Sequence, residues 1–295
     1  MDSTTPHLTT DRLQLKSLQE SDSSFILELL NTQGWLTFIG DRNVGTTEEA
    51  VSYIQNILND ETITYWVVYA EKVQIGVITL IKREHLPFYD IGFAFLPNYQ
   101  GNGYAYEASN AILELVIETS DYQTILAVTD PSNHSSIHLI EKLGLSFQKI
   151  EKSDGETSNI YGIDLDQLKI DRLIKKFFSA FTNKNTSPNL DLIYETCLAE
   201  AIIIKNTKGM PEVSNLESFI APRKDLLTNG SLQNFEEYEV KEKTIITRNI
   251  AQRFSTYQKE GTLDGKDFSE KGNKMFQFVK VDTTWKICNM IWDDE

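Results

Sequence analysis

The 295-residue sequence lacks several features that would define common classes of protein. No stretch approaches the roughly 18–20 apolar residues that a membrane helix needs. The start, Met1–Thr5, has neither a basic nor an apolar region, so we expect no secretory signal. The two cysteines, Cys197 and Cys288, lie far apart and form no CxxC pair, which indicates reduced thiols rather than a disulfide framework. Four scattered histidines offer no metal-ligand spacing. We therefore expect a cytoplasmic protein with no membrane partner and no metal.

Positive charge is also scarce, and it is unevenly placed. The net charge is −15, which argues against a nucleic-acid partner because phosphate backbones call for clustered Lys and Arg. Residues 1–167 hold 24 acidic and 9 basic side chains, whereas residues 168–295 hold 19 of each. Such asymmetry is typical of separate domains. An acidic surface attracts cationic ligands such as amines, although it also serves solubility alone.

The order of predicted elements divides the chain at the same place. Residues 1–167 alternate strand-like and helix-like segments, including a capped helix start at Thr46–Glu49 and a strand at Asp90–Phe95 that Pro97 stops. An amphipathic helix then begins near Ile170, and the remainder becomes strands. These strands are 238–246, 251–259, 275–281 and 285–292. We predict a mixed α/β domain over 1–167 and an α+β domain over 168–295.

The segment Leu96–Ala105 carries the clearest chemical signal. A strand ends, a loop with Gly101 and Gly103 turns, and a helix begins. Backbone amides and the positive helix end would form an anion site there, and glycine lets the backbone approach a phosphate. A dinucleotide fingerprint would need glycine where Tyr106 stands, and the P-loop pattern is absent. The alternative is a plain strand–turn–helix connection.

Two further segments give this loop a family context. Gln100–Ala105 reads Q-x-x-G-x-A, which resembles the pyrophosphate-binding motif [QR]-x-x-G-x-[GA] of the GNAT superfamily of N-acetyltransferases. Asn133–Leu145 resembles the N-x-x-S…E-K-L-G-[FL] block of the same superfamily. The ribosomal-protein N-acetyltransferase branch matches best, and Thr10–Leu13 also fits it. The resemblance covers residues 8–165.

The resemblance implies a mixed-sheet GNAT fold, acetyl-CoA as co-substrate and a set of site residues. Amides of the loop would hold the CoA pyrophosphate, and the backbone of Phe93 and Phe95 would pair with pantetheine while an amide in that strand stabilises the oxyanion. Asn133 would contact the pantetheine arm, or cap a helix, and Ser136 would lie near the CoA sulfur. The loop residues are Gln100, Gly101, Asn102, Gly103, Tyr104 and Ala105.

The proton transfers are less well marked. Many superfamily members place a tyrosine two residues before the Lys of the second block, but this chain has Ile140 there. Ser136 or a water would have to protonate the thiolate, or it leaves unaided. The attacking amine must also lose a proton. Asp90, through water, is our first candidate base and Glu107 the second, although Glu107 is on a cofactor-side helix where a structural role is common.

Residues 168–295 resemble the nuclear-transport-factor-2-like cone, including its SnoaL-like members, most of all at Trp285–Trp292. Such cones can enclose an apolar pocket or dimerise. Tyr194, Arg248, Tyr257 and Trp292 are candidates to line a pocket, or they pack in the core.

Three hypotheses follow for function. The first is an acetyl-CoA-dependent N-acetyltransferase that acts on a primary amine, either a small molecule or a protein N-terminus. The alternative is a CoA-binding sensor without catalysis, coupled to a ligand-binding cone. In the third, the C-terminal domain forms a homodimer and has no chemistry.

Overall fold

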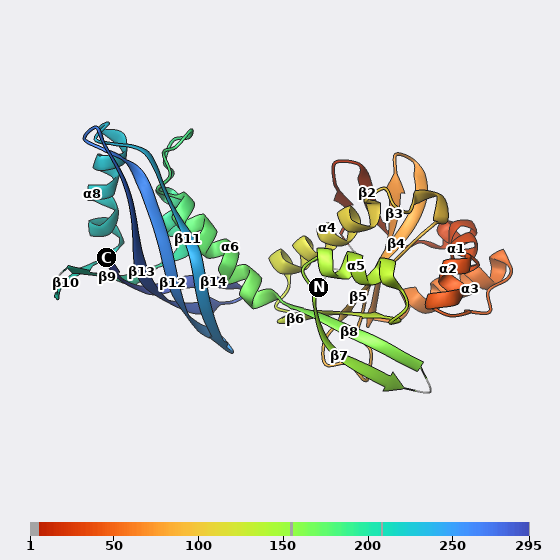
Figure 1. The fold of residues 1–295 in the computed structure, drawn as a ribbon. Helices are drawn as coiled ribbons and strands as arrows, with labels where there is room; N and C mark the ends of the chain where they lie inside the picture. Colours follow the sequence, from red (N-terminus) through yellow and green to blue (C-terminus); the bar gives the residue numbers. More distant parts are fainter. Residues whose placement is uncertain (1–5, 154–155, 208, 295) are drawn as a thin grey trace. The chain divides into compact units, whose positions relative to one another are not determined.

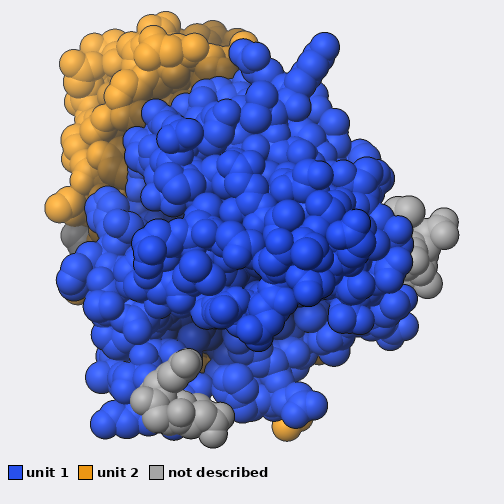
Figure 2. Space-filling view, turned by 90° about the vertical axis from the view of Figure 1, so that its right-hand side faces the viewer, with its two compact units in different colours: residues 1–165 blue, residues 166–295 orange. Residues whose placement is uncertain are grey.

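The computed structural model describes residues 6–153, 156–207 and 209–294. The chain forms two compact units, Met1–Leu165 and Asp166–Glu295, which Figure 2 shows in blue and orange. The change from one unit to the other falls at Leu165–Asp166, and the sequence pattern changes within two residues of it. Among the described residues, no helix is long and apolar enough to cross a bilayer.

The first unit is built on a mixed sheet with the strand order β1-β2-β3-β4-β5-β6-β8-β7 (Figure 1). Neighbouring strands are antiparallel, except that β5 and β6 run parallel. The strands are β1 Leu8–Thr9, β2 Leu13–Ser17, β3 Ile63–Ala70, β4 Val73–Ile81, β5 Asp90–Phe95, β6 Thr124–Thr129, β7 Ser146–Ser153 and β8 Glu156–Asp164. The α-helices are α1 Ser23–Leu30, α2 Gln33–Phe38, α3 Thr47–Leu58, α4 Tyr104–Thr119 and α5 His134–Lys142, and short 3-10 turns lie at Glu20–Asp22 and Pro97–Tyr99.

Local sequence explains much of this unit. Strand β4 is buried at six successive residues, as a central strand covered on both faces must be. Helix α3 starts with the predicted capping box, in which Thr46 and Glu49 satisfy each other's backbone N–H groups. Helices α1, α2 and α3 bury their apolar sides in one cluster with Val67 and Val77 of the sheet. The mixed α/β prediction for this half is confirmed.

The second unit holds a six-stranded sheet in the order β10-β9-β14-β13-β12-β11. Its elements are α6 Leu165–Ser179, α7 Asp191–Thr196, β9 Cys197–Thr207, β10 Met210–Ser214, α8 Leu216–Thr228, β11 Leu232–Thr247, β12 Ile250–Leu263, β13 Lys266–Val281 and β14 Thr284–Asp294. Strands β11 to β14, which include the four predicted strands, form an antiparallel meander, but β14 also pairs in parallel with β9. The sheet is therefore mixed rather than purely antiparallel. Figure 1 shows the curve of the long blue strands.

The core of the second unit lies on one face of this sheet. Apolar side chains of α6, α7 and α8 form a single buried cluster with inward-facing residues of the strands. Phe177 of α6 contacts Phe276 of β13 edge to face, with ring centroids 5.6 Å apart. Aromatic pairs of this kind add stabilisation beyond the area that they bury.

Candidate active site

Strands β5 and β6 diverge just after they meet. They pair at Asp90 and Leu126, and the Leu126 N–H donates to the Tyr89 carbonyl at 2.9 Å. No further pair between them is found in the described residues, although β5 stays paired with β4 along all six of its residues. One edge of β5 is therefore left without strand partners from Ile91 onward, which opens a gap between two parallel strands.

The alternation of the backbone decides which groups face this gap. Tyr89 directs its carbonyl to β6, whereas Leu96 directs its N–H to Ile75 on the other side of β5, at 2.9 Å. Successive residues of a strand point their N–H and C=O groups to opposite sides. The backbone groups of Phe93 and Phe95 therefore face the gap, where the sequence analysis expects pantetheine to pair. The Phe95 carbonyl already accepts a hydrogen bond from Gln100 Nε2 at 2.8 Å, so Gln100 also holds the loop to the strand.

The predicted anion loop follows β5 directly. Gly101 and Gly103 have φ values of +75° and +79°, a region that other residues rarely adopt. Gly103 is the N-cap of α4 and offers no side chain to cap it, while the first helical bond runs from the Glu107 N–H to the Gly103 carbonyl. The backbone N–H groups of Tyr104 and Ala105, in the first turn, therefore have no side-chain cap. An uncapped start on a 16-residue helix is a ready site for an anion.

An arginine from the start of the chain holds this loop. Arg12 Nη1 donates to the Asn102 carbonyl at 3.1 Å, and its Nε donates to Glu107 at 2.6 Å. The guanidinium also lies 4.6 Å from the centroid of the Tyr104 ring. Thr10 Oγ1 donates to the same carboxylate of Glu107 at 2.5 Å. The Thr10–Leu13 motif therefore clamps the loop and the first turn of α4 together.

These contacts change the interpretation of Glu107. Desolvation raises the pKa of its carboxyl, but the hydrogen bonds from Thr10 and Arg12 together outweigh this effect and keep the pKa below the usual value. A carboxylate bound by an arginine and a threonine is a poor acceptor of a proton from an amine. These contacts give Glu107 a structural role, and they disfavour the prediction that it serves as the second candidate base.

Helix α5 carries the second motif. Asn133 is its N-cap, and its side-chain oxygen accepts from the Ser136 N–H at 3.1 Å. The capping role proposed as one of two alternatives for Asn133 is thus present. Ser136 is half-buried in the first turn, whereas Ile140 is only 1% exposed. Ile140 is core, so the position at which the resemblance implies a tyrosine holds a buried aliphatic side chain.

Asp90 lies where β5 and β6 part. Its side chain is 3% exposed, and both oxygens accept from Arg83, at 2.7 Å from Nε and 3.2 Å from Nη2. Burial raises the pKa of Asp90, and the attraction of Arg83 only partly offsets this effect. Burial makes Asp90 a stronger proton acceptor than an exposed carboxylate, although both of its oxygens are already bound by Arg83. Sequence reasoning missed Arg83, whose pairing with Asp90 needs the turn between β4 and β5.

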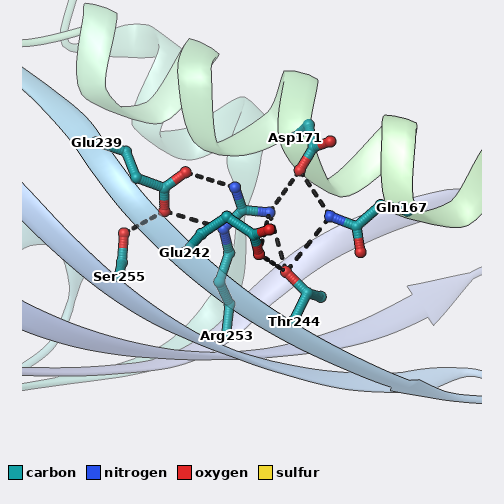
Figure 3. A network of polar contacts seen from close by, with 7 residues as sticks. All are labelled: Gln167, Asp171, Glu239, Glu242, Thr244, Arg253 and Ser255. Atoms are coloured by element: carbon teal, nitrogen blue, oxygen red, sulfur yellow. Dashed lines mark hydrogen bonds and ion pairs between the residues drawn. The ribbon is translucent and has the colours of Figure 1, made fainter. Parts of the chain in front are cut away.

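The second unit contains a separate polar cluster on the inner face of its sheet (Figure 3). Arg253 of β12 is 3% exposed and donates to Glu239 of β11 and to Asp171 of α6. Ser255 donates to the same Glu239. The network residues are Gln167, Asp171, Glu239, Glu242, Thr244, Arg253 and Ser255. Buried charge on this scale is costly unless it is paired, as it is here.

A buried lysine lies beside this cluster. Lys274 is the register partner of Ser255 and forms an ion pair with Glu237, with both side chains at most 10% exposed. Its ammonium lies 3.2 Å from the ring centroid of Tyr257 and 6.0 Å from that of Trp292. Tyr257 and Trp292 are therefore interior, which agrees with both alternatives predicted for them.

The other two candidate lining residues of the cone are at the surface. Tyr194 is 49% exposed, and Arg248 is exposed in the turn between β11 and β12. Their exposure rules out the alternative that they pack in the core, and their role in lining a pocket stays a prediction. The interior charges Arg253 and Lys274 were missed, although alternation with buried Ala251, Ser255 and Tyr257 marks Arg253 as inward-facing.

Comparison with known proteins places the first unit in a family. Residues 12–146 match the family model described as an acetyltransferase (GNAT) domain. The chain is 31% identical over 140 residues to YnaD of Bacillus subtilis strain 168, an uncharacterised N-acetyltransferase, covering 47% of this chain and 82% of YnaD. It is 28% identical over 149 residues to the uncharacterised protein YkkB of the same organism, covering 48% and 86%.

A solved acetyltransferase structure is similar in fold. It has a TM-score of 0.50 and 15% identity, and the match covers 57% of this chain and 94% of the other. The family model ends within the first unit, so the second unit lies outside it. The match to YnaD covers most of the length of YnaD, and the diverging strands and the uncapped helix start agree with it. The chain therefore belongs to the GNAT acetyltransferase family.

Proposed function

We propose that the first unit transfers the acetyl group of acetyl-CoA to a primary amine. The observation that carries this proposal is the gap between β5 and β6, which leads to a glycine loop and an uncapped helix start. An elongated molecule with a phosphate at one end and a hydrogen-bonding arm fits such a gap. CoA has this chemistry, and family membership supports it independently.

Different residues would bind different parts of acetyl-CoA. The amides from Gly101 to Ala105 would bind the pyrophosphate. The backbone of Phe93 would pair with the pantetheine arm along the free edge of β5, and Asn133 would contact that arm from α5. The Gln100 side chain would keep the loop docked on the strand, through its hydrogen bond to Phe95.

The proposed reaction is direct attack on the thioester. The amine nitrogen bonds to the carbonyl carbon, and a β5 amide stabilises the oxyanion. The C–S bond then breaks, and CoA leaves as a thiolate. The bonded nitrogen gives up its second proton, which reaches the thiolate through Ser136 or water, so that Ser136 regains the hydrogen that it donates. Asp90 would receive the proton of the ammonium through water, which its raised pKa favours. Its place where the strands part supports this assignment.

The acceptor is proposed to be a cationic amine, either a small molecule or a protein N-terminus. The first unit's excess of acidic residues supports this proposal, because an acidic surface concentrates ammonium ions near it.

A CoA sensor is the second candidate function. Its support is the burial of Ile140, which leaves the chain without the tyrosine that many relatives use. A sensor would bind acetyl-CoA and release no CoA with any amine.

We also propose that the second unit is a nuclear-transport-factor-2-like cone that binds a small ligand. Its support is the packing of α6 against a curved sheet and the polar cluster on the inner face. Charged groups inside an apolar interior give a ligand its orientation.

The test combines calorimetry with a thiol-release assay. Acetyl-CoA should bind, and CoA should be released with peptides, polyamines or aminoglycosides as acceptors. Gly103→Val should abolish binding because a β-branched residue is strained at φ +79°. Gly209→Val is the matched control, since Gly209 in the turn between β9 and β10 has φ +80° and open space around it. Binding without CoA release would favour the sensor, and no binding would refute both.

A further inference from the structure

A lysine–tyrosine contact joins the two helices of the first unit that carry the cofactor motifs. Lys142 is the last residue of α5, and Tyr106 is the third residue of α4. The ammonium of Lys142 lies 4.5 Å from the centroid of the Tyr106 ring. The two helices contact each other, and Figure 1 shows them side by side. A positive charge from α5 is therefore held beside the first turn of α4.

Lys142 has no acidic partner in the described part of the chain. Its side chain is exposed, and it forms no ion pair there with a carboxylate. Residues 1–167 hold 24 acidic and 9 basic side chains, so acidic partners are plentiful in this half of the chain. Arg12 and Arg83 of the same unit each have one. The charge of Lys142 is therefore available to a ligand.

The ring of Tyr106 limits where this ammonium can lie. A lysine side chain is long and flexible, so it loses conformational entropy when a ligand fixes it. Attraction to the face of an aromatic ring keeps the ammonium near that ring before any ligand binds. Tyr106 is half-buried, so its ring has less freedom than the exposed lysine. Part of the ordering of Lys142 is therefore already present in the free protein, which favours binding.

The surroundings of this ammonium have the chemistry of a phosphate site. The uncapped start of α4 offers backbone N–H groups, which carry only partial charges. The guanidinium of Arg12 lies at the same helix start, but Glu107 neutralises it at 2.6 Å. The acidic residues of this half of the chain repel an anion at longer range. A full positive charge beside the first turn of α4 offsets this repulsion, and Lys142 supplies one.

We propose that Lys142, positioned by Tyr106, binds a phosphate group of CoA. Lysine binds phosphate as a compact point charge, so it suits both kinds of phosphate that CoA carries. One is the pyrophosphate, and the other is the 3′-phosphate of the adenosine end, which has about two negative charges at neutral pH. The inference rests on the proposed function, because it requires CoA at the start of α4, and it adds a side chain that recognises the phosphates.

The test is titration calorimetry of the full chain with CoA and with 3′-dephospho-CoA, at low and high salt. Lys142→Met should raise the Kd of CoA about five-fold at low salt, because water partly screens a single exposed lysine–phosphate contact. Added salt should weaken CoA binding less in this variant than in the wild type. Lys142→Arg keeps the charge and should stay within about two-fold of the wild type. Lys72→Met is the matched control and should bind CoA as the wild type does, since Lys72 is exposed in the turn between β3 and β4.

The two ligands show which phosphate is bound. If Lys142 binds the 3′-phosphate, Lys142→Met should bind 3′-dephospho-CoA as tightly as the wild type does. If it binds the pyrophosphate, both ligands should lose affinity about five-fold. A cation in the last turn of α5 also stabilises that helix, but this role alone would lower the melting temperature and leave both Kd values unchanged. Kd values within about two-fold of the wild type for both ligands would overturn the proposal, whereas a wild type that binds neither ligand would refute the proposed function.

Substitutions of Tyr106 test whether it positions the lysine. Tyr106→Phe keeps the ring and should bind CoA as the wild type does, whereas Tyr106→Leu should raise the Kd about three-fold because it frees the ammonium. In the Lys142→Met background, Tyr106→Leu should have no further effect, since no ammonium remains to be positioned. Losses that add in the double variant would show that Tyr106 acts on CoA independently of Lys142, and they would refute its positioning role.

Discussion

Arg12→Ala tests whether the clamp prepares the anion loop for CoA. Arg12 ties the Asn102 carbonyl to Glu107 and stacks on Tyr104. Without it, the loop would have to be ordered when CoA binds, and the Glu107 carboxylate would lie unneutralised near the pyrophosphate. Both effects should weaken CoA binding and leave the turnover rate of the bound complex nearly unchanged.

The size of the effect follows from the exposure of the two groups. Hydrogen bonds to charged groups contribute about 1.5–3 kcal/mol when buried. The Arg12 side chain is 49% exposed and that of Glu107 is 18% exposed, so solvent screens much of the interaction. We therefore expect a loss of about 1–1.5 kcal/mol, which is roughly a five- to twelve-fold rise in Kd.

A second substitution separates the two causes. Glu107→Gln in the Arg12→Ala background removes the repulsion but not the cost of ordering, so it should recover part of the lost affinity. Glu107→Gln alone frees Arg12 for the phosphate, so CoA should bind as tightly as in the wild type or more tightly.

The assay is titration calorimetry with CoA at two salt concentrations, and Arg42→Ala is the control because Arg42 is an exposed arginine of the same unit. The clamp hypothesis is refuted if Arg12→Ala binds CoA within about two-fold of the wild type.

Three further predictions concern the base, the inner cluster and a helix cap. Asp90→Asn should lower turnover by about 10²–10⁴ and leave acetyl-CoA binding intact; in the wild type activity should rise with pH through the raised pKa of Asp90, and the variant should lose that rise. The stability of the protein should change with pH in the opposite direction, because burial raises the pKa of Asp90 in the folded state. The stabilisation by protonated Asp90 is present below its pKa in the unfolded state and is lost as pH rises through its pKa in the folded state. Urea titrations should show this loss of stability in the wild type and not in Asp90→Asn. Arg253→Met should lower the free energy of unfolding of the second unit by about 3 kcal/mol in urea titrations, since it leaves buried Glu239 without its cation. Lys176→Met, which breaks an exposed ion pair, should lower it by under about 1 kcal/mol. Equal losses in the two variants would contradict the argument from the buried network. Asn133→Ala should cost about 1 kcal/mol in thermal unfolding because it removes the cap of α5, and an unchanged melting temperature would show that the cap is dispensable.

Local signals were the ones that sequence reasoning used correctly. The α3 capping box was predicted from Thr46 and Glu49, because a cap depends on residues three positions apart. The glycine loop was predicted for a similar reason, since Gly101 and Gly103 adopt backbone conformations that other residues avoid. Strand β7 was missed, and it places Phe147 and Ile150 in solvent, against the rule that apolar residues mark a buried face.

What the sequence by itself determined is therefore local: most of the order of strands and helices, the caps and the loop that opens α4. Tertiary structure alone decided which distant groups meet. It brought Arg12 to Glu107 across 95 residues and Arg253 to Asp171 across 82 residues. It also set β6 beside β5, where pairing stops after Asp90. The physical reason is that hydrophobic period and backbone propensity act over a few residues, whereas an ion pair or a strand register depends on how whole elements pack.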